Sequence, residues 1–101
     1  MPKMLPFAIP YDALAELCRH YQVRELAVFG SATQQRYRPD SDIDLLVSFA
    51  PEARVTFTTL ARMQRELAAL LGRKVDLVSK EGLKPLIRDQ VLATAQVLYA
   101  A

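Results

Sequence analysis

The chain of 101 residues lacks several features that mark common classes of protein. Its single cysteine, Cys18, cannot form an intramolecular disulfide. The net charge is only +2, and no basic run is present, so we expect no direct nucleic-acid binding. No apolar run approaches the length of a membrane span, and the N-terminus lacks the features of a signal peptide. We therefore expect a cytoplasmic protein that does not associate with membranes.

Composition otherwise indicates an ordinary globular chain, with 51% apolar and 24% charged residues. The length predicts a single domain spanning residues 1–101. Apolar spacing predicts helices at about 10–21, 56–71 and 84–93, and strands at 25–29, 42–49 and 74–78. Residues 97–99 fit either a fourth strand or a continuation of the last helix. This order predicts an α/β (α+β) fold, a small sheet of three or four strands with helices packed on it.

The helix expected at 56–71 carries a clear apolar stripe. Its members recur at helical spacing, and we expect all of them to lie in the core: Phe57, Leu60, Met63, Leu67 and Leu71. Gly72 then fits the position just after a helix end.

Two carboxylates open the second expected strand. Asp42 and Asp44 are two residues apart, so on a strand they point to the same face. A third carboxylate, Asp76, lies in the next strand and approaches them if the two strands are neighbours. Clustered carboxylates repel one another, and their pKa values should rise unless cations fill the site. Magnesium favours such oxygen ligands, and two ions about 3.5–4 Å apart can clamp the oxygens of an in-line phosphoryl displacement.

A Gly30-Ser31 pair ends the first expected strand and supplies a candidate phosphate site. Glycine allows close approach of the backbone, and amides at a helix start can hold phosphate oxygens. Each feature alone has a structural alternative, since Asp42 could cap a turn and Asp76 could face solvent. Together they favour a site for a nucleoside triphosphate, with pyrophosphate as the leaving group.

With these motifs the chain resembles the minimal nucleotidyltransferase (MNT) family, small members of the DNA polymerase beta-like superfamily. The matching signature is Gly30-Ser31, ten intervening residues, and Asp42-Ile43-Asp44, followed by the apolar Leu45-Leu46-Val47. The segment 72–78 resembles the strand of this family that carries the third carboxylate. The resemblance implies a polymerase beta-like palm fold and transfer of AMP from ATP to an acceptor hydroxyl.

The resemblance also implies roles for individual residues. Asp42, Asp44 and Asp76 would be the catalytic residues and the ligands of two Mg²⁺ ions. Gly30, Ser31 and Arg38 would bind the nucleotide phosphates. Stand-alone members of this family are commonly antitoxins of HEPN/MNT pairs, so the implied partner is a HEPN-domain toxin, modified on a tyrosine, in a hetero-oligomer.

The segment 32–35 departs from the family pattern. Members usually continue Gly-Ser with Arg-Ala-Arg-Gly, where this chain has Ala32-Thr33-Gln34-Gln35. Glutamine cannot replace the charge of an arginine that binds phosphate. An alternative hypothesis is therefore a catalytically weak MNT-fold antitoxin that neutralises its toxin by occlusion. Nucleotidyl transfer to a small molecule is a third reading, and relatives of that kind carry an additional domain.

Overall fold

The computed structural model describes residues 8–30 and 42–101. The expectations for Ser31, Arg38 and the 32–35 segment lie outside the described residues. The elements are α1 (Tyr11–His20), β1 (Val23–Phe29), β2 (Ile43–Phe49), α2 (Phe57–Leu71), β3 (Val75–Ser79), the 3₁₀ helix η2 (Lys80–Gly82), α3 (Pro85–Thr94) and β4 (Gln96–Ala100). The expected α/β class is therefore confirmed.

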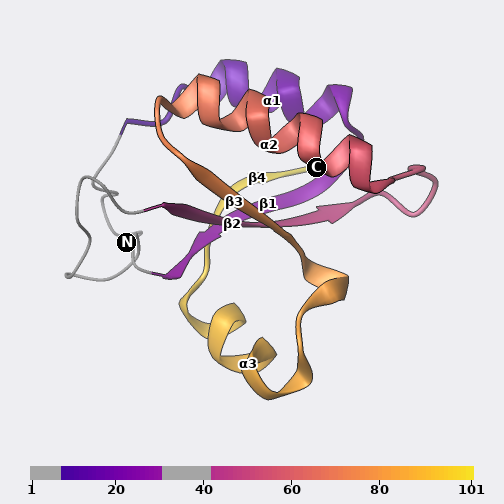
Figure 1. Cartoon of the computed structure of the whole chain (residues 1–101), viewed down its shortest axis with the longest axis vertical. Helices are drawn as coiled ribbons and strands as arrows, with labels where there is room; N and C mark the ends of the chain where they lie inside the picture. Colours follow the sequence, from indigo (N-terminus) through magenta and orange to yellow (C-terminus); the bar gives the residue numbers. More distant parts are fainter. Residues whose placement is uncertain (1–7, 31–41) are drawn as a thin grey trace.

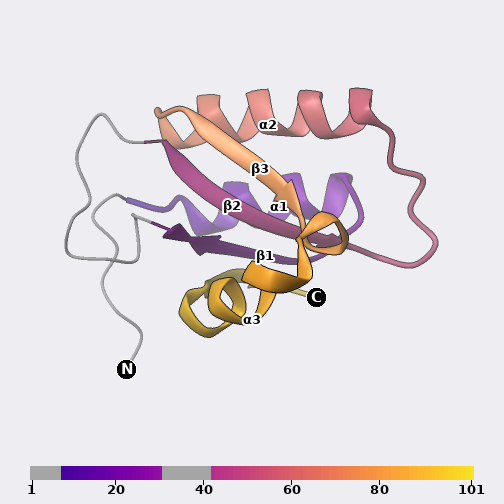
Figure 2. The same cartoon turned by 60° about the horizontal axis from the view of Figure 1, so that its bottom comes forward.

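The four strands form one mixed sheet in the order β3-β2-β1-β4. β2 pairs with β3 in parallel, through a crossover that contains α2, whereas β1 pairs antiparallel with both β2 and β4. Helices α1 and α2 lie side by side over one face of the sheet, and α3 lies on the other side (Figure 1). Figure 2 shows the end of β1 and the starts of β2 and β3 at one common end of the sheet.

The core lies between the sheet and the α1–α2 layer. Alternate residues of β2, namely Ile43, Leu45 and Val47, are fully buried against it, together with Met63 and Leu67 of α2. Leu46 points to the other face of β2 and is also buried. β2 is therefore buried on both faces at its centre, as its uninterrupted apolar run predicts.

Both ends of α2 follow from local sequence. Thr56 and Thr59 form a reciprocal capping box at the N-terminus, which satisfies backbone N–H groups that a helix leaves unpaired. Gly72 adopts a left-handed conformation at φ +67°, where glycine carries no Cβ penalty, and the helix stops there. The expected helix end at Gly72 is therefore confirmed.

Helix α2 also covers the outer edge of the sheet. The side-chain oxygen Oε1 of Gln64 accepts a 3.0 Å hydrogen bond from the backbone N–H of Leu77, in edge strand β3. The amide side chain thus takes the place that a further strand would occupy.

The structure revises one expectation and resolves another that the sequence leaves open. Phe57 is not a core residue, because its side chain is 91% exposed; it is the first residue of α2 and precedes the turns that bury Met63 and Leu67. Residues 97–99, which by sequence fit either a strand or a helix, lie in strand β4, because Ala95 has extended dihedral angles and Gln96 pairs with Val28. In the described ranges, no helix is long and apolar enough to cross a membrane.

Candidate active site

The parallel pairing of β2 and β3 places two of the candidate carboxylates opposite each other. Asp44 is the register partner of Asp76, and the N–H of Ile43 donates a 2.9 Å hydrogen bond to the carbonyl of Lys74 at the start of this ladder. Paired residues share a face of a sheet, so both carboxylates lie on the face opposite α1 and α2. Asp42 precedes β2 by one residue. The expected approach of the third strand to the second is thus observed.

The first strand ends against the same carboxylate. Phe29 is the antiparallel partner of Asp44, and Gly30 follows it with φ +73°. A Cβ atom built on Gly30 would lie 2.4 Å from Oδ2 of Asp44 and 3.3 Å from its Cγ. No side chain fits between these two residues. Gly30 therefore provides the space in which the carboxylate of Asp44 lies, in addition to allowing the positive φ.

The electrostatics of the three aspartates are coupled. Asp44 is half-buried, whereas Asp42 and Asp76 are exposed. Partial desolvation is the main cause that raises the pKa of the Asp44 carboxyl, and the negative charges of Asp76 and Asp42 raise this pKa further. A cation bound here would reverse the effect, because it would stabilise the ionised form.

The side chains do not form a closed ligand set. Within residues 8–30 and 42–101, no three His, Cys, Asp or Glu side chains are arranged so that they could hold a metal ion. The structure thus brings Asp44 and Asp76 into register and Asp42 within electrostatic reach.

The family comparison decides the class of this protein. Residues 12–101 match the family model described as polymerase beta, nucleotidyltransferase. The chain belongs to this nucleotidyltransferase family. The match spans the whole described sheet and includes all three aspartates, and it makes the chain an enzyme of the nucleotidyltransferase type.

Individual relatives agree with this assignment. The nucleotidyltransferase is 42% identical over 84 residues to the protein adenylyltransferase MntA of Thermococcus cleftensis, covering 83% of this chain and 81% of the relative. A chain from a crystal structure of a toxin–antitoxin with AMP-PNP matches with a TM-score of 0.74 at 22% identity, covering 92% of this chain and 75% of the other. A tri-AMPylated Shewanella oneidensis HEPN toxin in complex with an MNT antitoxin contains a chain that matches with a TM-score of 0.65 at 20% identity, with 90% and 70% covered. These two structures establish the likeness of fold.

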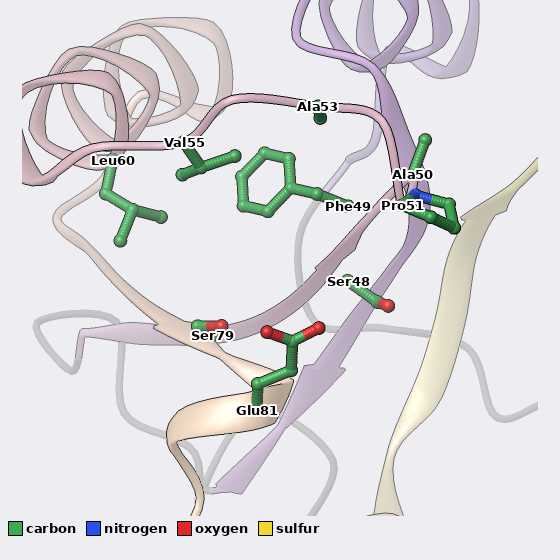
Figure 3. A pocket seen from close by; sticks show the side chains of 9 residues that line it. All are labelled: Ser48, Phe49, Ala50, Pro51, Ala53, Val55, Leu60, Ser79 and Glu81. Carbon is green, nitrogen blue, oxygen red and sulfur yellow. The ribbon is translucent and has the colours of Figure 1, made fainter.

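A cavity of about 330 Å³ lies at the opposite end of the sheet (Figure 3). Its walls combine apolar and polar side chains: Ser48, Phe49, Ala50, Pro51, Ala53, Val55, Leu60, Ser79 and Glu81. In Figure 3, Phe49, Val55 and Leu60 lie on one side, and Ser48, Ser79 and Glu81 lie on the other. None of the three candidate aspartates lines this cavity. The sequence did not predict this cavity, because the cavity forms where the turn after β2 meets the end of β3.

Two further perturbed groups lie away from the carboxylates. Burial raises the pKa of the Cys18 thiol to about 11, which makes the thiol a poor nucleophile. Desolvation and a hydrogen bond to Glu66 raise the pKa of Tyr21 to about 12. Both residues pack in the core layer beneath α1 and α2, on the sheet face opposite the aspartates, so we assign neither to the site.

Proposed function

We propose that this nucleotidyltransferase transfers AMP from ATP to a tyrosine hydroxyl of a HEPN toxin and thereby acts as its antitoxin. The observation that carries the proposal is the placement of Asp42, Asp44 and Asp76 at one end of one sheet face. Similarity to the adenylyltransferase MntA supports protein adenylylation. The toxin structures with AMP-PNP and with an AMPylated HEPN toxin support the donor and the acceptor.

The donor set fits magnesium. All three side chains offer carboxylate oxygens, which are the ligands that Mg²⁺ prefers, with waters and substrate phosphates completing its shell. The raised pKa of the Asp44 carboxyl supports this assignment, because negative charge there is unfavourable and a bound cation would offset it. We assign Asp42 and Asp44 to two ions, and Asp76 to one of them. Bound Mg²⁺ would neutralise charge on the triphosphate and on the leaving pyrophosphate.

The chain's own residues then have distinct tasks. In the proposed reaction the tyrosine oxygen bonds to the α-phosphorus of ATP, and the bond from that phosphorus to the bridging oxygen of the β-phosphate breaks. Pyrophosphate leaves, and the hydroxyl proton passes to Asp76 or to solvent. Gly30 keeps Asp44 in place, and we assign the phosphates to Gly30, Ser31 and Arg38. Reaction in line requires the acceptor to approach the sheet face that carries the carboxylates.

A label-transfer assay tests this function. The protein is incubated with α-labelled ATP, magnesium and the proposed HEPN partner. We expect labelled toxin, and we expect Asp44→Asn to lower the rate by about 100-fold or more, in the range found when one charge-stabilising group is removed from a site. Asp12→Asn, an exposed carboxylate on the opposite side in α1, is the matched control. Absence of transfer, or equal rates for the two variants, would exclude the proposal.

The occlusion hypothesis is a second candidate. The observation that favours it is the absence of the usual arginines at positions 32–35, which weakens the case for tight triphosphate binding. Rescue of cells from the toxin by an Asp42→Ala/Asp44→Ala double variant distinguishes the two hypotheses. Full rescue with unmodified toxin supports occlusion, whereas lost rescue with retained binding supports catalysis.

A further inference from the structure

The cavity beside the turn after β2 lies at the end of the sheet that the aspartates do not occupy. β2 and β3 run parallel, with Asp44 and Asp76 near their amino ends and Ser48 and Ser79 near their carboxyl ends. In open α/β sheets, ligand crevices form outside the carboxyl ends of the strands. The volume of about 330 Å³ falls within the range of small-molecule sites, about 300–1,000 Å³. The cavity can therefore hold a small ligand, apart from the proposed active site.

Backbone hydrogen bonds hold both walls of this cavity. In the turn after β2, the N–H of Ala50 donates a 2.9 Å hydrogen bond to the carbonyl of Gln22, and the N–H of Ala53 donates one of 2.9 Å to the carbonyl of Ala50. The other wall includes the 3₁₀ helix η2, which a hydrogen bond from the N–H of Leu83 closes. A site whose walls are already held loses little conformational entropy when a ligand binds.

The polar wall carries one charge. Of the described residues that line the cavity, Glu81 is the only ionisable one. Figure 3 shows its carboxylate pointing toward the apolar wall, on the same side of the cavity as the hydroxyls of Ser48 and Ser79. Within residues 8–30 and 42–101, this carboxylate forms no ion pair or hydrogen bond. Its acceptor oxygens are therefore available to a ligand that brings hydrogen-bond donors and a positive charge.

The two walls together select an organic cation. An ammonium group has three donors and no acceptor, which suits the Glu81 carboxylate beside two serine hydroxyls. The aromatic ring of Phe49 lies on the opposite wall and also attracts a cation. Val55 and Leu60 extend this wall with apolar surface for the body of the ligand. A nucleotide is disfavoured here, because the charge of Glu81 repels phosphate.

We propose that the cavity binds a small primary amine with an apolar or aromatic body. The ammonium group donates hydrogen bonds to Glu81 and to the hydroxyls of Ser48 and Ser79, and the body packs against Phe49 and the apolar wall. This binding site goes beyond the proposed function, since it involves neither ATP nor the aspartates. It is a second site at the far end of the strands that carry Asp44 and Asp76.

The test uses phenethylamine as the probe and phenethyl alcohol as its neutral isostere, with calorimetry at pH 7. We expect the wild type to bind the amine with a Kd on the order of 1 mM or below. Glu81→Gln should raise this Kd about fivefold, the upper end for an ion pair that water reaches. It should leave the weaker binding of the alcohol unchanged. Glu52→Gln is the matched control, because Glu52 is an exposed carboxylate of the same turn that does not line the cavity, and it should alter neither Kd more than twofold.

Heteronuclear NMR titration locates the bound probe. Amide shifts should change at Ala53, Ser79 and Glu81, and those of Asp44 and Asp76 should stay the same. No saturable binding of phenethylamine to wild type would overturn the proposal. Equal Kd values for the amine and the alcohol, for Glu81→Gln and wild type, or shifts confined to residues outside the cavity would also overturn it. The assay contains neither ATP nor a HEPN protein, so failure of the proposed adenylylation does not affect its result.

Discussion

The contact between Gly30 and Asp44 gives the sharpest prediction, for the substitution Gly30→Ala. The added Cβ would lie 2.4 Å from Oδ2 of Asp44, which is 0.6 Å short of the 3.0 Å that real Cβ contacts respect. The added methyl group is attached directly to the backbone, whereas the atoms it meets belong to the Asp44 side chain, so the carboxylate of Asp44 must move. The required shift of 0.6 Å is somewhat smaller than the misplacement of about 1 Å that can lower a rate by about 100-fold, so we take about 100-fold as the upper end of the expected loss, equivalent to about 2.7 kcal/mol of activation free energy.

The same substitution also strains the backbone, and a control separates the two effects. An L-residue at φ +73° costs about 1–2 kcal/mol, which lowers Tm by roughly 4–16 °C in a domain of this size. Gly72→Ala imposes the same strain at φ +67° but meets no atom within 4 Å. Both variants should therefore melt earlier, as followed by circular dichroism.

Only Gly30→Ala should lose activity in the label-transfer assay, measured well below both melting temperatures. Its rate should fall below that of Gly72→Ala by up to about 100-fold. A rate within threefold of Gly72→Ala would refute the reasoning, because it would show that the position of the Asp44 carboxylate does not depend on Gly30.

Three further predictions concern stability and reactivity. The pKa of the Asp44 carboxyl is raised in the folded state, so ionisation of Asp44 destabilises the fold as pH rises through that pKa. Asp44→Asn should therefore be more stable than wild type at pH 7 with EDTA. Urea titrations should show that this difference in the free energy of unfolding vanishes below about pH 4. Thr56→Ala removes the capping box of α2 and should lower the free energy of unfolding by about 1 kcal/mol, whereas exposed Thr58→Ala serves as the control and should change it little. Cys18 should react with a thiol reagent only as fast as the protein unfolds, since its thiol is buried and its pKa is about 11; rapid modification of native protein would contradict this.

The elements were predictable wherever one periodicity dominates. The stripe through Met63 and Leu67 identifies α2, and its failure at Phe57 has a local cause, because the first residue of a helix can extend past the sheet it packs on. The apolar residues of the segment that forms β4 follow neither helical nor strand spacing clearly. The segment is a strand because it pairs with β1, and this pairing joins residues about seventy positions apart, which local propensity does not encode.

The placement of the candidate site residues was predictable only in part. Alternation along a strand places Asp42 and Asp44 on one face, and a parallel crossover through α2 makes Asp76 a neighbour. The contact of Gly30 with Asp44 depends on the exact register of β1 against β2, which the spacing of motifs does not specify.

The hydrogen bond from Leu77 to Gln64 has a consequence for the arrangement of the aspartates. Side chains alternate along β3, so a slip of one residue against β2 would turn Asp76 toward the α1–α2 layer and leave Val75 or Leu77 at the site. Gln64 bonds to the residue next to Asp76 and so fixes the register of an edge strand from the neighbouring helix. A neutral amide on α2 thus helps to determine how many negative charges the opposite face presents. Gln64→Leu changes no charge, and label transfer at the wild-type rate by that variant would show that the register is held without it.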